Sequence, residues 1–175
     1  LYIEREDFME VPVKGYHRLY PGNEIRLKGA YYIKAVSIDK DSDGNIIAVH
    51  CTYDEESRGG ETPDGRKVKG TSHWVSAKYN LKAEVRQYDK LFKAEIPGHA
   101  TGNYLDDINP DSLVVLNNAV IEEEGKKSKV GDYIQFVRNR YYCVDSKDST
   151  PEHMVFNRTV TLKDSWSKMK AKMGI

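Results

Sequence analysis

The sequence lacks most features that would tie a protein to a metal, a membrane or an oxidising compartment. It has 2 cysteines, Cys51 and Cys143, which lie far apart and show no CxxC spacing. We expect both to be reduced core residues of a cytoplasmic protein rather than a disulfide or a metal pair. No apolar run is long enough to span a membrane, and no charged-then-apolar leader opens the chain, so neither an anchor nor a secretory signal is predicted.

An excess of positive charge is also missing. Lys and Arg together number 27, as do Asp and Glu, so the formal net charge is zero. This balance argues against a protein that binds nucleic acid through its overall charge. It leaves open a protein whose basic residues gather on one face.

Catalytic and metal-binding patterns are absent as well. The 5 histidines show no zinc-ligand spacing, and there is no Gly-rich phosphate loop. Residues 39–45 resemble the start of a calcium loop, but its twelfth position is His50, where a bidentate Glu is needed. A solvated hairpin turn is the favoured interpretation. We therefore expect no catalytic residue, no metal and no cofactor in this chain.

What the sequence does contain is alternation of aromatic and β-branched residues with polar ones, which is typical of strands. Strands are predicted over residues 24–38 (one long strand or a bent pair), 46–53, 67–75, 83–88, 112–120, 133–137 and 141–144. The Asp-Gly pair within residues 41–44 is typical of a type I′ hairpin, and residues 138–140 form another tight turn. Short helical turns are predicted at residues 4–8, 104–108 and 164–173. Many short strands with frequent turns indicate an all-β fold of two small β-barrels.

Some positions within these elements can be assigned to the core or to the surface. One buried face is predicted to hold Ile25, Leu27, Tyr31, Ile33 and Val36. Residues 57–63, rich in Gly and polar side chains, are predicted to be an exposed loop. Trp74 is assigned to the core, and Arg66, Lys67 and Lys69 to a solvated or backbone-facing stripe.

The two clusters of strands define the predicted domains. We expect a first barrel at residues 1–78, a second at residues 79–155, and a returning strand with a C-terminal tail at residues 156–175. The chain opens on Leu1 in a strand-like pattern without a methionine, which predicts a fragment of a longer protein with a truncated first barrel.

Several segments together carry a resemblance to a known family. The most distinctive are Cys-Thr-Tyr-Asp at residues 51–54 and Asp-Gly-Arg-Lys-Val-Lys-Gly-Thr-Ser-His-Trp-Val-Ser-Ala at residues 64–77. The others lie at residues 3–8, 26–31, 88–92, 108–113 and 155–160. In this order they resemble the C-terminal anticodon-binding region of the glutaminyl-tRNA synthetases. The match spans nearly the whole chain.

The resemblance implies two β-barrels with terminal strands that cross between them. It would place residues 156–160 near the first barrel or the junction, with Asn157 and Arg158 tying that strand to a neighbouring loop. It also implies a parent glutamine–tRNA ligase, a class I enzyme whose ATP and Mg bind in a catalytic domain upstream of Leu1. The HIGH-type and KMSKS-type motifs of that domain are absent here. The implied partner is the anticodon loop of tRNA(Gln), bound by a monomer with no membrane association.

In the family, separate groups of residues lie beside the splayed anticodon bases. The matching positions here are Lys14, His17 and Arg18 by the third base, Arg26 and Lys28 by the first, Gln135 and Arg138 by the middle one, and Ser165 close to this region. Departures from the family pattern fall at Gly15, His17, Lys28 and Ser165, where Gln, Lys, Arg and Thr are common. Lys28 lacks the planar fork of Arg, so looser first-base contact is expected. His17 implies a weakly pH-dependent contact. A further family arginine would lie upstream of Leu1.

Two alternatives stay open. A eukaryote-type or archaeal-type glutamyl-tRNA synthetase shares this barrel region, although the Gln135 and Arg138 pair and the spacing of Tyr16 and Arg18 favour the glutaminyl interpretation. The second alternative is a stand-alone RNA-binding barrel protein or a protein-interaction module.

Overall fold

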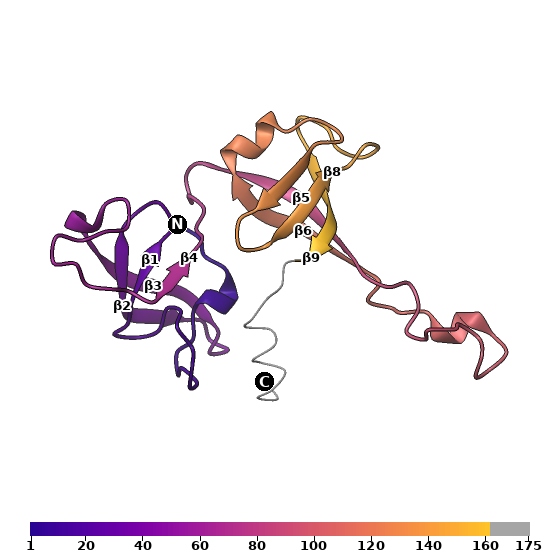
Figure 1. Cartoon of the computed structure of the whole chain (residues 1–175), viewed down its shortest axis with the longest axis horizontal. Helices are drawn as coiled ribbons and strands as arrows, with labels where there is room; N and C mark the ends of the chain where they lie inside the picture. The colour runs from indigo at the N-terminus through magenta and orange to yellow at the C-terminus, as the bar shows by residue number, and fades with distance from the viewer. Residues whose placement is uncertain (162–175) are drawn as a thin grey trace. The chain divides into compact units, whose positions relative to one another are not determined.

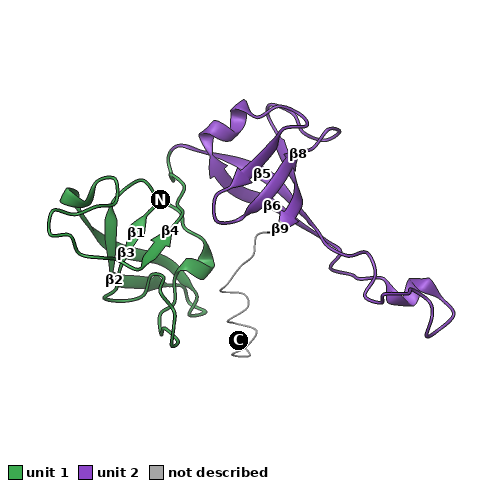
Figure 2. Cartoon of the chain, in the orientation of Figure 1, with its two compact units in different colours: residues 1–78 green, residues 79–175 purple. Residues whose placement is uncertain are grey.

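A computed structural model describes residues 1–161 of the chain (Figure 1). The chain divides into two compact units, Leu1–Lys78 and Tyr79–Ile175 (Figure 2). Each unit is built on one sheet, so the predicted all-β architecture is confirmed. The helical turn predicted at residues 164–173 and the predicted contact residue Ser165 lie outside the described residues.

The first unit holds a sheet of four strands in the order β3-β2-β1-β4. Its elements are η1 (Arg5–Asp7), β1 (Glu24–Leu27), β2 (Tyr32–Lys40), β3 (Ile46–Asp54), η2 (Glu55–Ser57) and β4 (Gly70–Ser72). The predicted bent pair at residues 24–38 is therefore β1 and β2, which are antiparallel. The strand predicted at residues 67–75 is shorter in the structure, where only β4 forms, and β4 runs parallel to β1.

One face of this sheet carries the core of the first unit. Ile25, Leu27, Ile33 and Ala35 pack there with Phe8, Leu19 and the half-buried Trp74, as predicted for Trp74. The prediction for Val36 was wrong, because Ile33 and Ala35 alternate inward and leave Val36 61% exposed. Tyr31 is only half-buried, whereas its neighbour Tyr32 is buried on the opposite face.

The β2–β3 hairpin turns at residues 41–45, as predicted, but not as a type I′ turn. Asp41 Oδ1 accepts hydrogen bonds from the backbone N–H groups of Asp43 and Asn45, at 3.0 and 2.8 Å. Gly44 has φ +83°, while Asp43 has no positive φ, so only one residue takes the left-handed conformation. This agrees with a type I turn followed by a left-handed glycine. His50 pairs with Asp39 at 2.7 Å, and the calcium-like segment is a solvated hairpin.

Two burial assignments in the first unit need correction. The predicted exposed loop at residues 57–63 is largely exposed, but Ser57 and Gly60 within it are buried, because they bond to Tyr32. Cys51 was assigned to the core but is exposed on the edge strand β3. Cys143 is half-buried.

The second unit holds a sheet of five strands in the order β6-β5-β9-β8-β7. Its elements are β5 (Asn80–Tyr88), η3 (Tyr104–Asp107), β6 (Leu113–Glu122), η4 (Glu123–Lys127), β7 (Tyr133–Phe136), β8 (Arg140–Val144) and β9 (Met154–Thr161). Ala83, Val85, Ile121, Tyr142, Val144, Met154 and Phe156 form its core.

Strand β9 lies in the middle of the second sheet, between β5 and β8 (Figure 1). It is parallel to β5 and antiparallel to β8. Residues 156–160 were expected to return toward the first barrel or the junction, whereas the strand pairings that the structure gives them are with β5 and β8 of the second sheet. Asn157 and Arg158 do tie β9 down, as predicted. Asn157 Nδ2 donates to Asp145 Oδ2 at 2.6 Å, and Arg158 donates to the carbonyl of Tyr88.

Residues 89–112 form a long excursion between β5 and β6 that projects from the second sheet (Figure 1). Its two halves meet at a bridge between Phe92 and Ile108. The Phe92 ring also packs against Tyr104, with ring centroids 6.4 Å apart.

Candidate nucleic-acid interface

The first predicted group, Lys14, His17 and Arg18, lies on the segment that leads into β1. Lys14 and His17 are exposed. Arg18 is anchored, because its Nη1 lies 2.7 Å from Oδ1 of the buried Asp7. The adjacent Tyr16 is buried and donates its hydroxyl to the Glu6 carbonyl at 3.0 Å. Burial raises the Tyr16 pKa above its usual value, so the phenol stays neutral.

The second predicted group, Arg26 and Lys28, lies at the end of β1. Arg26 is half-buried, and Lys28 is exposed one residue beyond the strand. The backbone of Lys28 is held on both sides: its N–H donates to Ser72 O at 2.9 Å, and its carbonyl accepts from Trp74 Nε1 at 3.1 Å. The side chain of Lys28 is thus presented from a fixed backbone.

These two groups flank the same pair of strands. A Cβ on Gly70, the first residue of β4, would lie 2.2 Å from the carbonyl oxygen of His17. Gly70 also pairs with Ile25 of β1. Only glycine permits this approach, which brings the segment of His17 against β4, the neighbour of the strand that carries Arg26.

Arg66 was predicted to be part of a solvated or backbone-facing stripe; its side chain is 35% exposed, but it is bound to carboxylates rather than left to solvent. Its guanidinium bonds with Glu24 at 3.0 Å, with Asp64 at 2.7 Å and with Asp54. The hydrogen bonds to these carboxylates, Glu24 foremost, raise the Arg66 pKa further. Arg66 is therefore a structural cation, whereas its neighbours Lys67 and Lys69 are exposed as predicted.

The third predicted group, Gln135 and Arg138, lies on the β7–β8 hairpin of the second unit. Gln135 is exposed and pairs directly with Tyr141, which is 41% exposed. Tyr133 lies two residues before Gln135 and is 78% exposed on the same face. The exposed Arg138 occupies the turn with φ 65°.

The structure thus places Gln135 on a solvated sheet face that also carries two exposed tyrosines. A Gln side chain donates and accepts hydrogen bonds at once, and aromatic rings stack unpaired bases. Sequence reasoning missed Tyr133 and Tyr141, although the alternation Tyr-Ile-Gln-Phe at residues 133–136 already places Tyr133 and Gln135 on one face.

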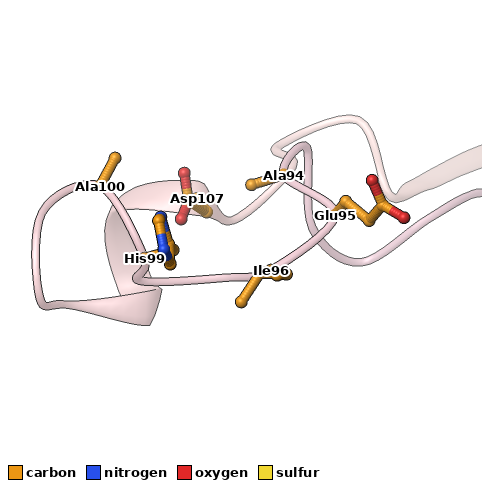
Figure 3. Close-up of a pocket in the computed structure, with 6 residues that line it drawn as sticks. All are labelled: Ala94, Glu95, Ile96, His99, Ala100 and Asp107. Atoms are coloured by element: carbon orange, nitrogen blue, oxygen red, sulfur yellow. The ribbon is translucent and has the colours of Figure 1, made fainter.

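Other kinds of site have little support in the part of the chain that the structure describes. No group of three or more His, Cys, Asp or Glu residues is arranged to hold a metal ion there. No helix among residues 1–161 is long and apolar enough to cross a membrane. A pocket in the β5–β6 excursion is lined by Ala94, Glu95, Ile96, His99, Ala100 and Asp107 (Figure 3). Its Asp107 accepts a hydrogen bond from the Gly98 N–H at 2.7 Å, so this carboxylate shapes the loop.

Comparison with known proteins identifies relatives along the whole chain. Two family models, both described as the anti-codon binding domain of class I tRNA synthetases (E and Q), match residues 1–54 and residues 71–145. A glutamine–tRNA ligase from Vibrio vulnificus is 49% identical over 98% of this chain and 31% of its own length. Those of Photobacterium profundum and Clostridioides difficile are 52% and 46% identical, over 97% of this chain and 30% and 31% of their own lengths.

The chain therefore spans less than a third of the length of these relatives. The first matched segment lies within the first unit, and the second begins at the end of the first unit and covers most of the second. The resemblance noted from the sequence is confirmed, and the chain belongs to the anticodon-binding domains of the class I tRNA synthetases for glutamate and glutamine.

Proposed function

We propose that this chain is the part of a glutamine–tRNA ligase that reads the anticodon of tRNA(Gln). The whole enzyme would attach glutamine to the tRNA with ATP and Mg, in a catalytic domain outside this chain. We further propose that the enzyme is a cytoplasmic monomer and that this region binds no cofactor. The observation that carries the proposal is the near 50% identity to glutamine–tRNA ligases over almost the entire chain.

The geometry of the second unit supports recognition of an unstacked base. Gln135 presents a donor and an acceptor on a solvated face, with Tyr133 and Tyr141 beside it. Sequence-specific RNA recognition uses such side chains on splayed bases, with aromatic rings as stacking surfaces. Arg138, in the adjacent turn, adds a guanidinium that suits base acceptors or phosphate.

The first unit supports contact with the RNA backbone and the flanking bases. Lys14, His17 and Lys28 are exposed; the segment of His17 lies against β4, and Lys28 directly follows β1. In a chain without net charge, local cations such as Lys14 and Lys28 would supply the electrostatic part of the affinity. Binding energy gathered at the anticodon would then favour the productive geometry of the acceptor end in the complete enzyme.

The test is binding of RNA stem-loops to the 175-residue chain by fluorescence anisotropy. We expect tighter binding to the tRNA(Gln) anticodon stem-loop than to the tRNA(Glu) stem-loop or to one with a scrambled loop. A preference for the tRNA(Glu) stem-loop would instead favour the glutamyl alternative. Equal binding to all RNAs would contradict anticodon recognition.

A further inference from the structure

The side chain of Arg26 is enclosed by two residues that lie outside the predicted contact set. Its Nη2 donates to the hydroxyl of Tyr32 at 3.1 Å, and its Cζ lies 5.4 Å from the centroid of the Tyr32 ring. The Tyr32 hydroxyl in turn donates to the carbonyl oxygen of Gly60 at 2.9 Å. Because Tyr32 is only 1% exposed, these two hydrogen bonds fix its hydroxyl in place.

The backbone around Tyr32 is fixed as well. Its N–H donates to Ser57 Oγ at 2.7 Å, and that hydroxyl donates to the carbonyl of Asp54. The residues that cover Tyr32 therefore belong to the segment that follows β3. Tyr32 is therefore held rigidly, and it can order the long, flexible side chain of Arg26 that packs on its ring.

Gly60 leaves the space that Arg26 occupies. A Cβ at this position would lie 2.8 Å from Arg26 Cδ and 3.0 Å from its Nε. The backbone there also has φ +97°, which disfavours any residue with a side chain. A larger residue at position 60 would therefore displace Arg26 from the Tyr32 ring.

The charge of Arg26 is left without a partner in the described part of the chain. Arg66 lies over the same ring, with its Cζ 5.3 Å from the Tyr32 centroid, and it takes the carboxylates of Glu24 and Asp54. No ion pair to Arg26 is found within residues 1–161, and its buried Nε has no hydrogen-bond partner there. With Nη2 bound to Tyr32, the Nη1 edge is the part of the guanidinium left for an external acceptor.

We propose that Tyr32 is a positioning residue for tRNA: its hydroxyl and ring hold Arg26 so that Nη1 meets an acceptor oxygen of the first anticodon nucleotide. The inference rests on the proposed function. A free arginine side chain loses rotamer entropy on binding, and a side chain already ordered by Tyr32 and Gly60 loses less. Tyr32 and Gly60 would thus raise affinity without touching the RNA.

A double-mutant cycle on the 175-residue chain tests this proposal. Binding of the tRNA(Gln) anticodon stem-loop is measured for wild type, Tyr32→Phe, Arg26→Ala and the double variant. Tyr32→Phe keeps the ring and removes one charge-assisted hydrogen bond, so we expect affinity to fall about 3- to 10-fold. In the Arg26→Ala background the same substitution should change affinity less than about 1.5-fold, because Tyr32 acts only through Arg26.

Two further variants separate positioning from general damage. Tyr53→Phe is the matched control, because Tyr53 is an exposed residue whose hydroxyl donates to Glu55 at 3.2 Å. The affinity of this variant for the stem-loop should equal that of wild type. Gly60→Ala displaces Arg26 by a different route and should lower affinity in the wild-type background while having little effect in Arg26→Ala. Thermal melting of every variant shows whether the fold is retained.

The outcomes are distinguishable. A wild-type chain that binds no stem-loop would overturn the proposed function and this inference with it. A wild-type chain that binds, with equal losses from Tyr32→Phe in both backgrounds, would overturn the inference alone, because Tyr32 would then act through the fold. An unaltered affinity of Arg26→Ala would also overturn it.

Discussion

Arg18 Nη1 lies 2.7 Å from Oδ1 of Asp7, whose side chain is only 2% exposed. A residue predicted to contact RNA is therefore also the partner of a buried carboxylate. The same site holds the buried Tyr16, so the segment before β1 is fixed to η1 by an ion pair and a hydrogen bond. The predicted RNA contact and the ion pair that anchors this segment therefore involve the same side chain.

Loss of this ion pair should destabilise the first unit. Removing one partner of a buried pair leaves an uncompensated charge and costs about 3 to 5 kcal/mol. Arg18 is 23% exposed, so we expect Arg18→Ala to lie near the lower end, about 3 kcal/mol. Urea unfolding measures the change. Lys126→Ala, which breaks an exposed pair with Glu123, is the control and should change stability by less than about 0.5 kcal/mol. An equal effect of both substitutions would contradict the structural role of Arg18.

The central position of β9 predicts a large cost for truncating Phe156. This ring is fully buried and packs against Phe136 with centroids 5.3 Å apart. Phe156→Ala should lower the free energy of unfolding of the second unit by about 3 to 5 kcal/mol. Val160→Ala on the same strand, where the side chain is 57% exposed, should cost far less. Similar losses at both positions would argue against β9 as a core strand.

Acid should weaken the second unit through Asp145. The Asp145 carboxylate accepts hydrogen bonds from the backbone N–H of Asp148, the side chain of Asn157 and the backbone N–H of Lys147. These bonds lower the Asp145 pKa to about 2. The unfolded value is about 3.9, so the stabilisation is complete above that pH and is lost as the pH falls toward 2. Thermal melting from pH 5 to pH 2 should show a shallower decline for Asp145→Asn than for wild type. Glu152→Gln, an exposed carboxylate on the same loop, should keep the wild-type profile.

Arg138 offers a substitution that separates binding from folding. Its φ of 65° is unfavourable for a residue with a Cβ, and glycine accepts it freely. Arg138→Gly should therefore preserve the melting temperature while weakening stem-loop binding by about 1 to 3 kcal/mol, chiefly for the correct middle base. Gln135→Ala should show the same dependence on the middle base. Equal losses for correct and altered middle bases would mean that these residues contact only phosphate.

The salt dependence of stem-loop binding should show whether the first unit contacts RNA phosphates. With no net charge, the chain should neutralise few phosphates, on the order of three to five, and the slope of log K against log salt should be roughly −2 to −4. Changing Arg26 and Lys28 together to Ala should flatten this slope by about one to two. The double change of Lys126 and Lys127 to Ala in the second unit is the matched control. A slope altered only by the control would place the RNA elsewhere.

Local pattern was sufficient to predict most of the strands and the position of the first hairpin turn, although not its type. β3, β5, β6 and β8 lie where alternation placed them, and the Asp-Gly pair at residues 43–44 marks the first hairpin. Such features depend on neighbours in sequence, which periodicity reports directly. The solvated face of β7 follows from the same rule, and so does its exposed Gln135.

Long-range pairing was not predictable in the same way. The Arg66 ion pair joins residues 42 positions apart, and the Arg158 bond to Tyr88 joins residues 70 apart. Nothing local distinguishes Arg66 from the exposed Lys67 beside it. Tyr32 likewise lies on the face opposite the core, and it is buried only because the segment after β3 folds over it. The location of β9 depends on partners in β5 and β8 rather than on its own sequence.

The placement of β9 also determines when each unit can fold during synthesis. All strands of the first sheet are complete by Ser72, so this unit can fold while later residues are still being added. The second sheet cannot join β5 to β8 until residues 154–161 have left the ribosome, because the strand between them is made last. Until then, the β5–β6 and β7–β8 hairpins expose unpaired edges and apolar side chains. During this interval the second unit therefore exposes the surfaces that favour aggregation.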